Sequence, residues 1–354
     1  MSDLQTLKGV FRWQAAFCRK SGSPISALVM ERLSDDINAA PPYGLLLAPW
    51  LDSSSEAVFA DAVAMRMLGA FHSLVLSHQA QTLASIYASD PEAIDPRELS
   101  AALTRAASDH MEVMASFLAS PPQTNEVARC LALVGGFLTV AQETRLPLRC
   151  LELGASAGLN MNWDRFGYAF GGGARWGDGR SPVQLCGDWD GANPPLPSVH
   201  VAERAACDQN PIDVTDMSEA LKLQSFVWVG QSLRLERIRA AIAVKRETGG
   251  VPDRADAADW AQAHVHPKAG VATVVYHSVF LQYPPEPIQR RIVAAIEAAG
   301  AAATPDAPVA WLSMEIDPKA TAGPMEVLLT QWPGGARRLL AHAHPHGATV
   351  RWRA

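Results

Sequence analysis

The sequence has few cysteines, and their spacing suits neither a metal site nor a disulfide framework. Only five occur among 354 residues, with no C-x-x-C pair. A structural zinc site would need closely spaced cysteine pairs, and a fold stabilised by disulfides would be richer in cysteine. We therefore expect reduced cysteines that mostly belong to the core. They are Cys18, Cys130, Cys150, Cys186 and Cys207.

Long apolar runs and an excess of basic charge are also missing. No segment reaches the roughly 20 apolar residues that span a bilayer, and the first residues lack the pattern of a secretory signal. The formal net charge is −6, so there is no electrostatic footprint for nucleic acid or an anionic membrane. We expect a cytoplasmic protein that acts on a small molecule or on another protein.

Several catalytic motifs are missing as well. The chain contains no G-x-x-x-x-G-K-[ST] loop and no G-x-S-x-G elbow, which argues against P-loop and hydrolase chemistry. His342, His344 and His346 alternate as metal ligands on a strand could, but Pro345 interrupts them and no carboxylate is close in sequence. We predict no metal site.

The hydrophobic pattern predicts two regions. Residues 1–120 show apolar residues at three- and four-residue steps and no convincing strand, which predicts an all-helical domain. Residues 121–354 alternate strands and helices, with strands expected near 150–153, 199–208, 226–229, 273–278 and 309–314. Helices are expected over 127–140, 231–244 and 287–299.

The C-terminal pattern predicts a hairpin, because segments 325–332 and 337–352 have no helix between them. The predicted class is therefore α/β: a Rossmann-like, doubly wound, mostly parallel seven-stranded sheet that ends in an antiparallel hairpin, with an N-terminal all-helical domain. The glycine-rich segment 167–193 is interpreted as an inserted hairpin or loop, which could cover a ligand or be a plain surface loop.

The segment 149–160 carries the main candidate site. A short apolar strand containing Glu152 runs into a turn of small residues with Gly154, Ser156 and Gly158, and Asn160 can open the next helix. A dinucleotide fingerprint would need a glycine where Ser156 stands, so a pyrophosphate cradle is disfavoured. An ordinary strand–turn–helix would fit the same residues.

This segment resembles the first motif of class I S-adenosylmethionine-dependent methyltransferases. The resemblance implies that Glu152, the small-residue turn and the helix start hold the methionine part and ribose of S-adenosylmethionine. Class I methyltransferases also end their sheet in a reversed hairpin, which agrees with the predicted C-terminus.

Four further side chains are candidates because they follow predicted strands, where ligands of α/β sheets bind. Asp208 could accept hydrogen bonds from ribose hydroxyls, or cap a turn. Gln231 could contact adenine, with Trp228 beside it, or both could be structural. His277 could be a general base or a satisfied structural histidine, and Tyr283 would line the acceptor side.

A wider resemblance covers nearly the whole chain. Ser23-Pro24, the Gln-Thr-Asn-Glu run at 123–126 with Arg129, and the motifs above look like domain-of-unknown-function family 2332, an uncharacterised bacterial family. It implies a methyltransferase-like fold with an N-terminal helical domain, but no established reaction. Gln123, Asn125, Glu126 and Arg129 are predicted to form a substrate-binding wall, although Thr124 or Asn125 could be only a helix cap.

Our leading hypothesis is an S-adenosylmethionine-dependent methyltransferase with a small-molecule acceptor. The alternative is a non-catalytic module that binds a nucleoside-type ligand or a protein partner. A nicotinamide oxidoreductase is a third possibility, weakened by the missing pyrophosphate glycine and the predicted hairpin. Neither the acceptor nor the oligomeric state is indicated by the sequence.

Overall fold

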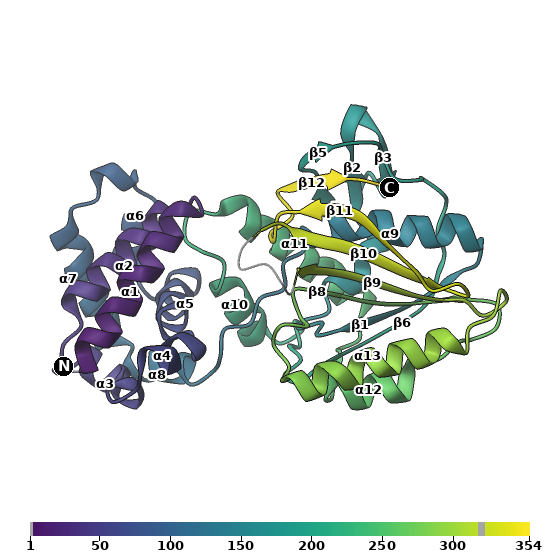
Figure 1. The fold of residues 1–354 in the computed structure, drawn as a ribbon. Coiled ribbons are helices and arrows are strands. Elements are labelled where there is room, and N and C mark those ends of the chain that lie inside the picture. The colour runs from purple at the N-terminus through teal and green to yellow at the C-terminus, as the bar shows by residue number, and fades with distance from the viewer. Residues whose placement is uncertain (1–2, 318–322) are drawn as a thin grey trace. The chain divides into compact units, whose positions relative to one another are not determined.

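The computed structural model describes residues 3–317 and 323–354, which divide into two compact units. The helical unit contains the chain up to Thr124 together with Thr215–Glu236. The α/β unit contains Asn125–Val214 and Arg237–Ala354. Figure 1 shows the helices and strands of both units.

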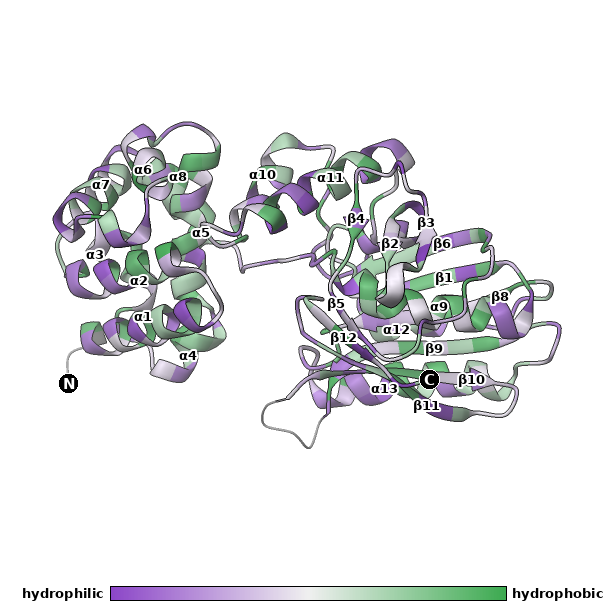
Figure 2. Cartoon of the chain, turned by 90° about the horizontal axis from the view of Figure 1, so that it is seen from above, coloured by the Kyte–Doolittle hydropathy of each residue, from purple (hydrophilic) through white to green (hydrophobic). Residues whose placement is uncertain are grey.

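The helical unit is built around α5 (Val63–Leu76), whose residues are mostly apolar and mostly buried (Figure 2). Other helices pack against it because a helix with so many apolar residues must be buried. Between residue 3 and Thr124 the structure contains no strand, as predicted. The surrounding helices are α1 (Asp3–Lys20), α2 (Pro24–Asp36), α3 (Tyr43–Leu46), α4 (Ser55–Ala60), α6 (Gln81–Tyr87), α7 (Pro96–Asp109), α8 (Met111–Leu118) and α10 (Met217–Ser225).

The prediction of a strand at 226–229 is wrong, because these residues follow α10 and complete the core of the helical unit. The ring of Phe226 lies 5.2 Å from that of Phe117, centroid to centroid. Trp228 is buried against Phe17, and the carbonyl of Val229 accepts a hydrogen bond from Ser23. A short apolar run looks the same in a strand and in a buried irregular segment, so periodicity could not separate them. The predicted α/β segment 121–354 is therefore interrupted at this point.

The α/β unit contains a mixed, mostly parallel sheet in the order β5-β12-β11-β10-β9-β8-β1-β6-β7. The α/β class is as predicted, but over residues 3–317 and 323–354 the sheet has nine strands rather than seven. Two of the additional strands, β5 and β7, lie at the edges and contain only three and two residues, too few to show a pattern. The strands are β1 (Leu148–Leu153), β5 (Asp188–Asp190), β6 (Val201–Asp208), β7 (Asp253–Arg254), β8 (Ala272–Ser278), β9 (Val309–Ile316), β10 (Met325–Trp332), β11 (Ala336–Ala343) and β12 (Thr349–Trp352).

The predicted C-terminal hairpin is present as β10 and β11, which pair antiparallel. Its second strand was predicted to run to 352, but β11 ends at Ala343 and a turn separates it from β12. β12 pairs antiparallel with β11 and parallel with β5.

Helices cover both faces of the sheet (Figure 1). α9 (Arg129–Thr144) packs on one face, over β8 to β11, while α12 (Ala257–His264) and α13 (Glu286–Ala301) pack on the other. α9 approaches closely because Gly135 and Gly136 face the sheet: a Cβ on Gly136 would lie 2.3 Å from Leu312. The remaining long helix, α11 (Ser232–Thr248), contributes its residues from Arg237 onward to this unit.

Of the segment 167–193, predicted to be an inserted hairpin or loop, residues 167–185 form a small separate sheet and residues 188–190 form β5 of the large sheet. β2 (Gly167–Ala169) pairs antiparallel with β3 (Arg175–Gly177) and parallel with β4 (Gln184–Leu185). Throughout the part of the chain that the structure describes, no helix is both long and apolar enough to cross a membrane.

Candidate functional site at the carboxyl ends of the parallel strands

Three neighbouring parallel strands bring the candidate residues to one edge of the sheet. β1 lies between β6 and β8, with Leu153 opposite Cys207 and Glu152 opposite Tyr276. Because parallel strands end at the same edge, Glu152, Asp208 and Tyr276 come together although they are far apart in sequence. This is the arrangement that the sequence predicts for Glu152 and Asp208.

The turn after β1 is compact and fixed by backbone hydrogen bonds. Gly154, Ser156 and Gly158 all have positive φ, at 68°, 55° and 66°. The amide of Ala155 donates to the carbonyl of Cys207 at 3.0 Å, and the amide of Ser156 donates to a carboxylate oxygen of Asp208 at 2.8 Å. Ser156 therefore adopts the left-handed conformation at the position where a dinucleotide fingerprint has glycine.

The predicted helix start at Asn160 is only partly correct. Asn160 opens a 3-10 helix, η3 (Asn160–Arg165), which is interrupted at Asn162, instead of an α-helix. Its side chain caps nothing: the amide oxygen accepts from the thiol of Cys130 at 3.4 Å, and the amide nitrogen donates to the carbonyl of Glu126 at 3.5 Å. The turn is therefore tied to the chain that leads into α9.

Glu152 is a buried acid at the end of β1. Burial raises its pKa to about 8, although the hydroxyl of Tyr276, which donates at 3.1 Å, and the charge of Lys245 both act to lower it. Desolvation dominates because the side chain is only 3% exposed. At neutral pH the carboxyl is therefore largely protonated unless a cation comes to pair with it.

Lys245 is the residue at this edge that the sequence analysis missed. It lies on α11, is 4% exposed, and has a pKa lowered by burial. Its ammonium donates to the thioether of Met161 at 3.7 Å and lies so close to the turn that a Cβ on Gly158 would be 3.2 Å away. The helical spacing with Ile238, Ala241 and Ile242 on the buried face of α11 could have revealed it.

Two buried donors at this edge of the sheet, one in the turn and one on α11, lack an oxygen partner among the described residues. Among residues 3–317 and 323–354, only the thioether of Met161 accepts from the ammonium of Lys245. In the same described part of the chain, the hydroxyl of Ser156 is buried and has no hydrogen-bond partner. A buried donor that lacks an oxygen acceptor carries a desolvation cost, which a hydrogen bond to a ligand oxygen would reduce.

Asp208 ends β6 and is half-buried. Its two carboxylate oxygens accept from the amides of Ser156, at 2.8 Å, and Asn210, at 2.9 Å. A carboxylate oxygen can accept more than one hydrogen bond, so these contacts are compatible with an acceptor role toward ligand hydroxyls.

Three of the four residues of the predicted substrate wall support the turn and the start of α9. Asn125 accepts from the amide of Leu159 at 2.9 Å, and Glu126 accepts from the amide of Ala128 at 3.2 Å. Arg129 donates to the carbonyls of Ser278, at 3.1 Å, and Pro345, at 2.9 Å. α9 begins at Arg129 without a side-chain cap, so the capping role considered for Thr124 or Asn125 is wrong.

Gln123 and Gln231, two further predicted site residues, belong to the helical unit. The amide nitrogen of Gln231 donates to the carbonyl of Ser21 at 3.4 Å, and its amide oxygen accepts from Arg234. These contacts lie within the helical unit, and they make Gln231 part of its packing rather than the end of a sheet strand.

His277 is held by neighbours on both ring nitrogens. Nδ1 lies 2.6 Å from a carboxylate oxygen of Glu315, and Nε2 accepts from the indole of Trp311 at 2.9 Å. Because Nε2 is the acceptor, Nδ1 carries the ring hydrogen and donates a hydrogen bond to Glu315. Burial alone would raise the pKa of Glu315, but hydrogen bonds from His277, Phe280 and Leu281 outweigh it and lower that pKa. A general base here would first need the Trp311 indole to release Nε2.

The turn after β8 covers the first glycine of the site. Val279 has a φ of 51°, which is strained for a β-branched residue. Phe280 then packs so tightly on Gly154 that a Cβ there would lie 2.1 Å from its ring. Tyr283, predicted to line the acceptor side, is 73% exposed.

No metal-binding cluster of three or more His, Cys, Asp or Glu side chains occurs among the described residues. The fold and site define a mixed α/β protein with a polar turn at the ends of its parallel strands. The chain belongs to a family of uncharacterised proteins conserved in bacteria, DUF2332, whose model matches residues 8–352. The search of curated proteins and the search of solved structures found no match.

Proposed function

We propose that this protein is an S-adenosylmethionine-dependent methyltransferase that acts on a small molecule. The observation that carries the proposal is the buried pair of Glu152 and Lys245 beside the Gly154–Gly158 turn. An α-amino acid end has one ammonium and one carboxylate, so an acid and a base that are both desolvated and not ion-paired complement it.

The residues present fit such a cofactor. Glu152 would accept from its ammonium, while Lys245 and the unpartnered hydroxyl of Ser156 would donate to its carboxylate. Asp208 would accept from ribose hydroxyls. Binding would satisfy the two buried donors that lack oxygen partners within the described part of the chain.

When bound, S-adenosylmethionine supplies an electrophilic methyl group. The chain's own contribution would be to orient the cofactor and to exclude water, since in-line methyl transfer depends mainly on alignment. His277 and Glu315 would act by fixing the 279–281 turn, with Phe280 against Gly154.

Calorimetric titration with S-adenosylmethionine and S-adenosylhomocysteine tests the cofactor. We expect saturable binding that Asp208→Asn weakens about tenfold, by loss of a charged acceptor. The matched control is Asp306→Asn, an exposed aspartate before β9. A folded wild-type protein that binds neither compound would contradict the proposal, as would equal loss in the control.

A second titration isolates the amino acid end. Lys245→Met should weaken S-adenosylhomocysteine binding strongly and leave 5′-methylthioadenosine, which lacks the amino acid end, unaffected. Equal affinity of Lys245→Met and wild type for S-adenosylhomocysteine would remove Lys245 from the site while leaving the cofactor assignment intact.

The non-catalytic alternative has one observation in its favour: the proposed base His277 is committed to Trp311 and Glu315. This candidate predicts saturable binding of S-adenosylhomocysteine without transfer of labelled methyl groups to a broad panel of acceptors. Transfer to any acceptor would rule it out.

A further inference from the structure

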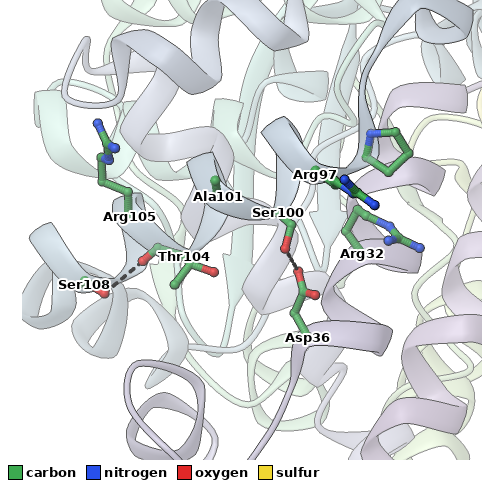
Figure 3. Close-up of a pocket in the computed structure, with 9 residues that line it drawn as sticks. Arg32, Asp36, Arg97, Ser100, Ala101, Thr104, Arg105 and Ser108 are labelled. Carbon is green, nitrogen blue, oxygen red and sulfur yellow. Dashed lines mark hydrogen bonds between the residues drawn. The ribbon is translucent and has the colours of Figure 1, made fainter.

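The helical unit contains a groove, lined by charged and hydroxyl-bearing side chains, that the proposed function does not use. It encloses about 600 Å³ between α2 and α7 and is lined by Arg32 and Asp36 from α2 and by the exposed face of α7 (Figure 3). Its volume lies in the range of small-molecule sites. The α7 residues in the lining are Pro96, Arg97, Ser100, Ala101, Thr104, Arg105 and Ser108.

The composition of the lining indicates an anionic ligand. Three guanidinium groups and three hydroxyls face one carboxylate, and no aromatic or large aliphatic side chain contributes. Within the described part of the chain, the guanidinium groups of Arg97 and Arg105 have neither a hydrogen-bond nor an ion-pair partner. Both guanidinium groups add positive charge to the groove, so a bound anion would be attracted to it.

The other charged side chains of the groove already have partners within the protein. Arg32 pairs with Asp35, and Asp36 accepts a hydrogen bond from Ser100 (Figure 3). Thr104 shares a hydrogen bond with Tyr43 at 3.3 Å, which fixes its hydroxyl. Arg97 and Arg105 are thus the two cations left for a ligand.

The positions of Arg97 and Arg105 indicate how long an anionic ligand of this groove would be. In Figure 3, Arg32 and Arg97 lie at one end of the groove and Arg105 at the other. Eight residues of α-helix separate Arg97 from Arg105, which is about 12 Å along the axis. The N-terminal end of α7, where Pro96 begins the helix, adds positive partial charge near Arg97.

We infer that this groove binds a small molecule that carries phosphate groups. The planar guanidinium of Arg97 would bind phosphate oxygens in pairs, and Arg105 would meet a second acidic group or a hydroxylated body of the ligand. This site lies within the helical unit and is independent of the strand-end turn.

The test is titration of the full chain with inorganic pyrophosphate, inorganic phosphate and citrate near 0.15 M salt. We expect saturable pyrophosphate binding that Arg97→Gln weakens about tenfold or more, because a charged hydrogen bond is lost. Arg19→Gln is the matched control: it removes the same charge from the helical unit, outside the groove, where Arg19 pairs with Glu31. The buried face of α7 is untouched by the Arg97 change, so both variants should fold.

Asp36→Asn gives a test of opposite sign. Removing the only carboxylate in the lining should tighten pyrophosphate binding. Three results would overturn the inference: no saturable binding to the folded wild type, equal weakening by Arg97→Gln and Arg19→Gln, or citrate binding as tightly as pyrophosphate.

Discussion

Glu152→Gln changes how the stability of the protein depends on pH. The folded state raises the pKa of Glu152 from 4.5 to about 8, whereas the unfolded chain keeps the ordinary value. Below pH 4.5 the acid is protonated in both states and folding carries no penalty. As pH rises, the unfolded chain ionises first, so stability is lost until the pH passes about 8.

The size of this effect follows from the two pKa values. A change from 4.5 to about 8 corresponds to about 5 kcal/mol once both states are ionised. The penalty would be about 2 kcal/mol near pH 6 and about 5 kcal/mol near pH 9. Between these two pH values the free energy of unfolding of the wild type should therefore fall by about 3 kcal/mol more than that of Glu152→Gln.

Urea unfolding of both proteins near pH 6 and pH 9 measures this difference. The glutamine keeps an oxygen for the hydroxyl of Tyr276, although its buried NH₂ group adds a cost that does not vary with pH. The informative quantity is thus the difference between the two pH slopes. Glu297→Gln, on the exposed side of α13, is the control and should follow the wild type. Parallel slopes for wild type and Glu152→Gln would refute the assignment of a buried, protonated acid.

Three further predictions address neighbouring residues. Gly154→Ala should lower the free energy of unfolding by about 3 kcal/mol or more, because the new Cβ would clash with Phe280 and φ is 68°. The control is Gly172→Ala, where φ is 63° but no atom lies near the new Cβ. It should lose only about 1 kcal/mol, the cost of the left-handed backbone. Equal losses in urea titration would show that the Phe280 contact is unimportant. Lys245→Met should raise the urea midpoint of the ligand-free protein by removing a buried ammonium, and a lowered midpoint would contradict this. Glu315→Gln should cost about 2 kcal/mol at neutral pH through weaker hydrogen bonds to His277 and the 280–281 amides. Since the pKa of Glu315 is lowered on folding, the wild type should lose this advantage as pH falls below 4.5, and a difference that persists in acid would count against it.

Local sequence was sufficient where a structural element depends on its own periodicity or turn residues. The helices before residue 120 and the β10–β11 hairpin could be predicted for this reason. The same reasoning failed for 226–229, where four apolar residues are buried by helices from distant parts of the chain. It also missed β5 and β7, which are strands only because a partner strand lies beside them.

For the candidate site too, some features could be predicted from local sequence and others could not. The sequence by itself determined that an acid, a small-residue turn and a second acid would meet at one edge of a parallel sheet, because the positions of strands and turns along the chain are set locally and parallel strands end at the same edge. Only the tertiary structure decided that Glu152 is desolvated, that Lys245 joins it, and that Trp311 and Glu315 occupy His277. Those properties depend on contacts between residues about 35 to 90 positions apart, and desolvation and hydrogen bonding arise only once such residues are packed together.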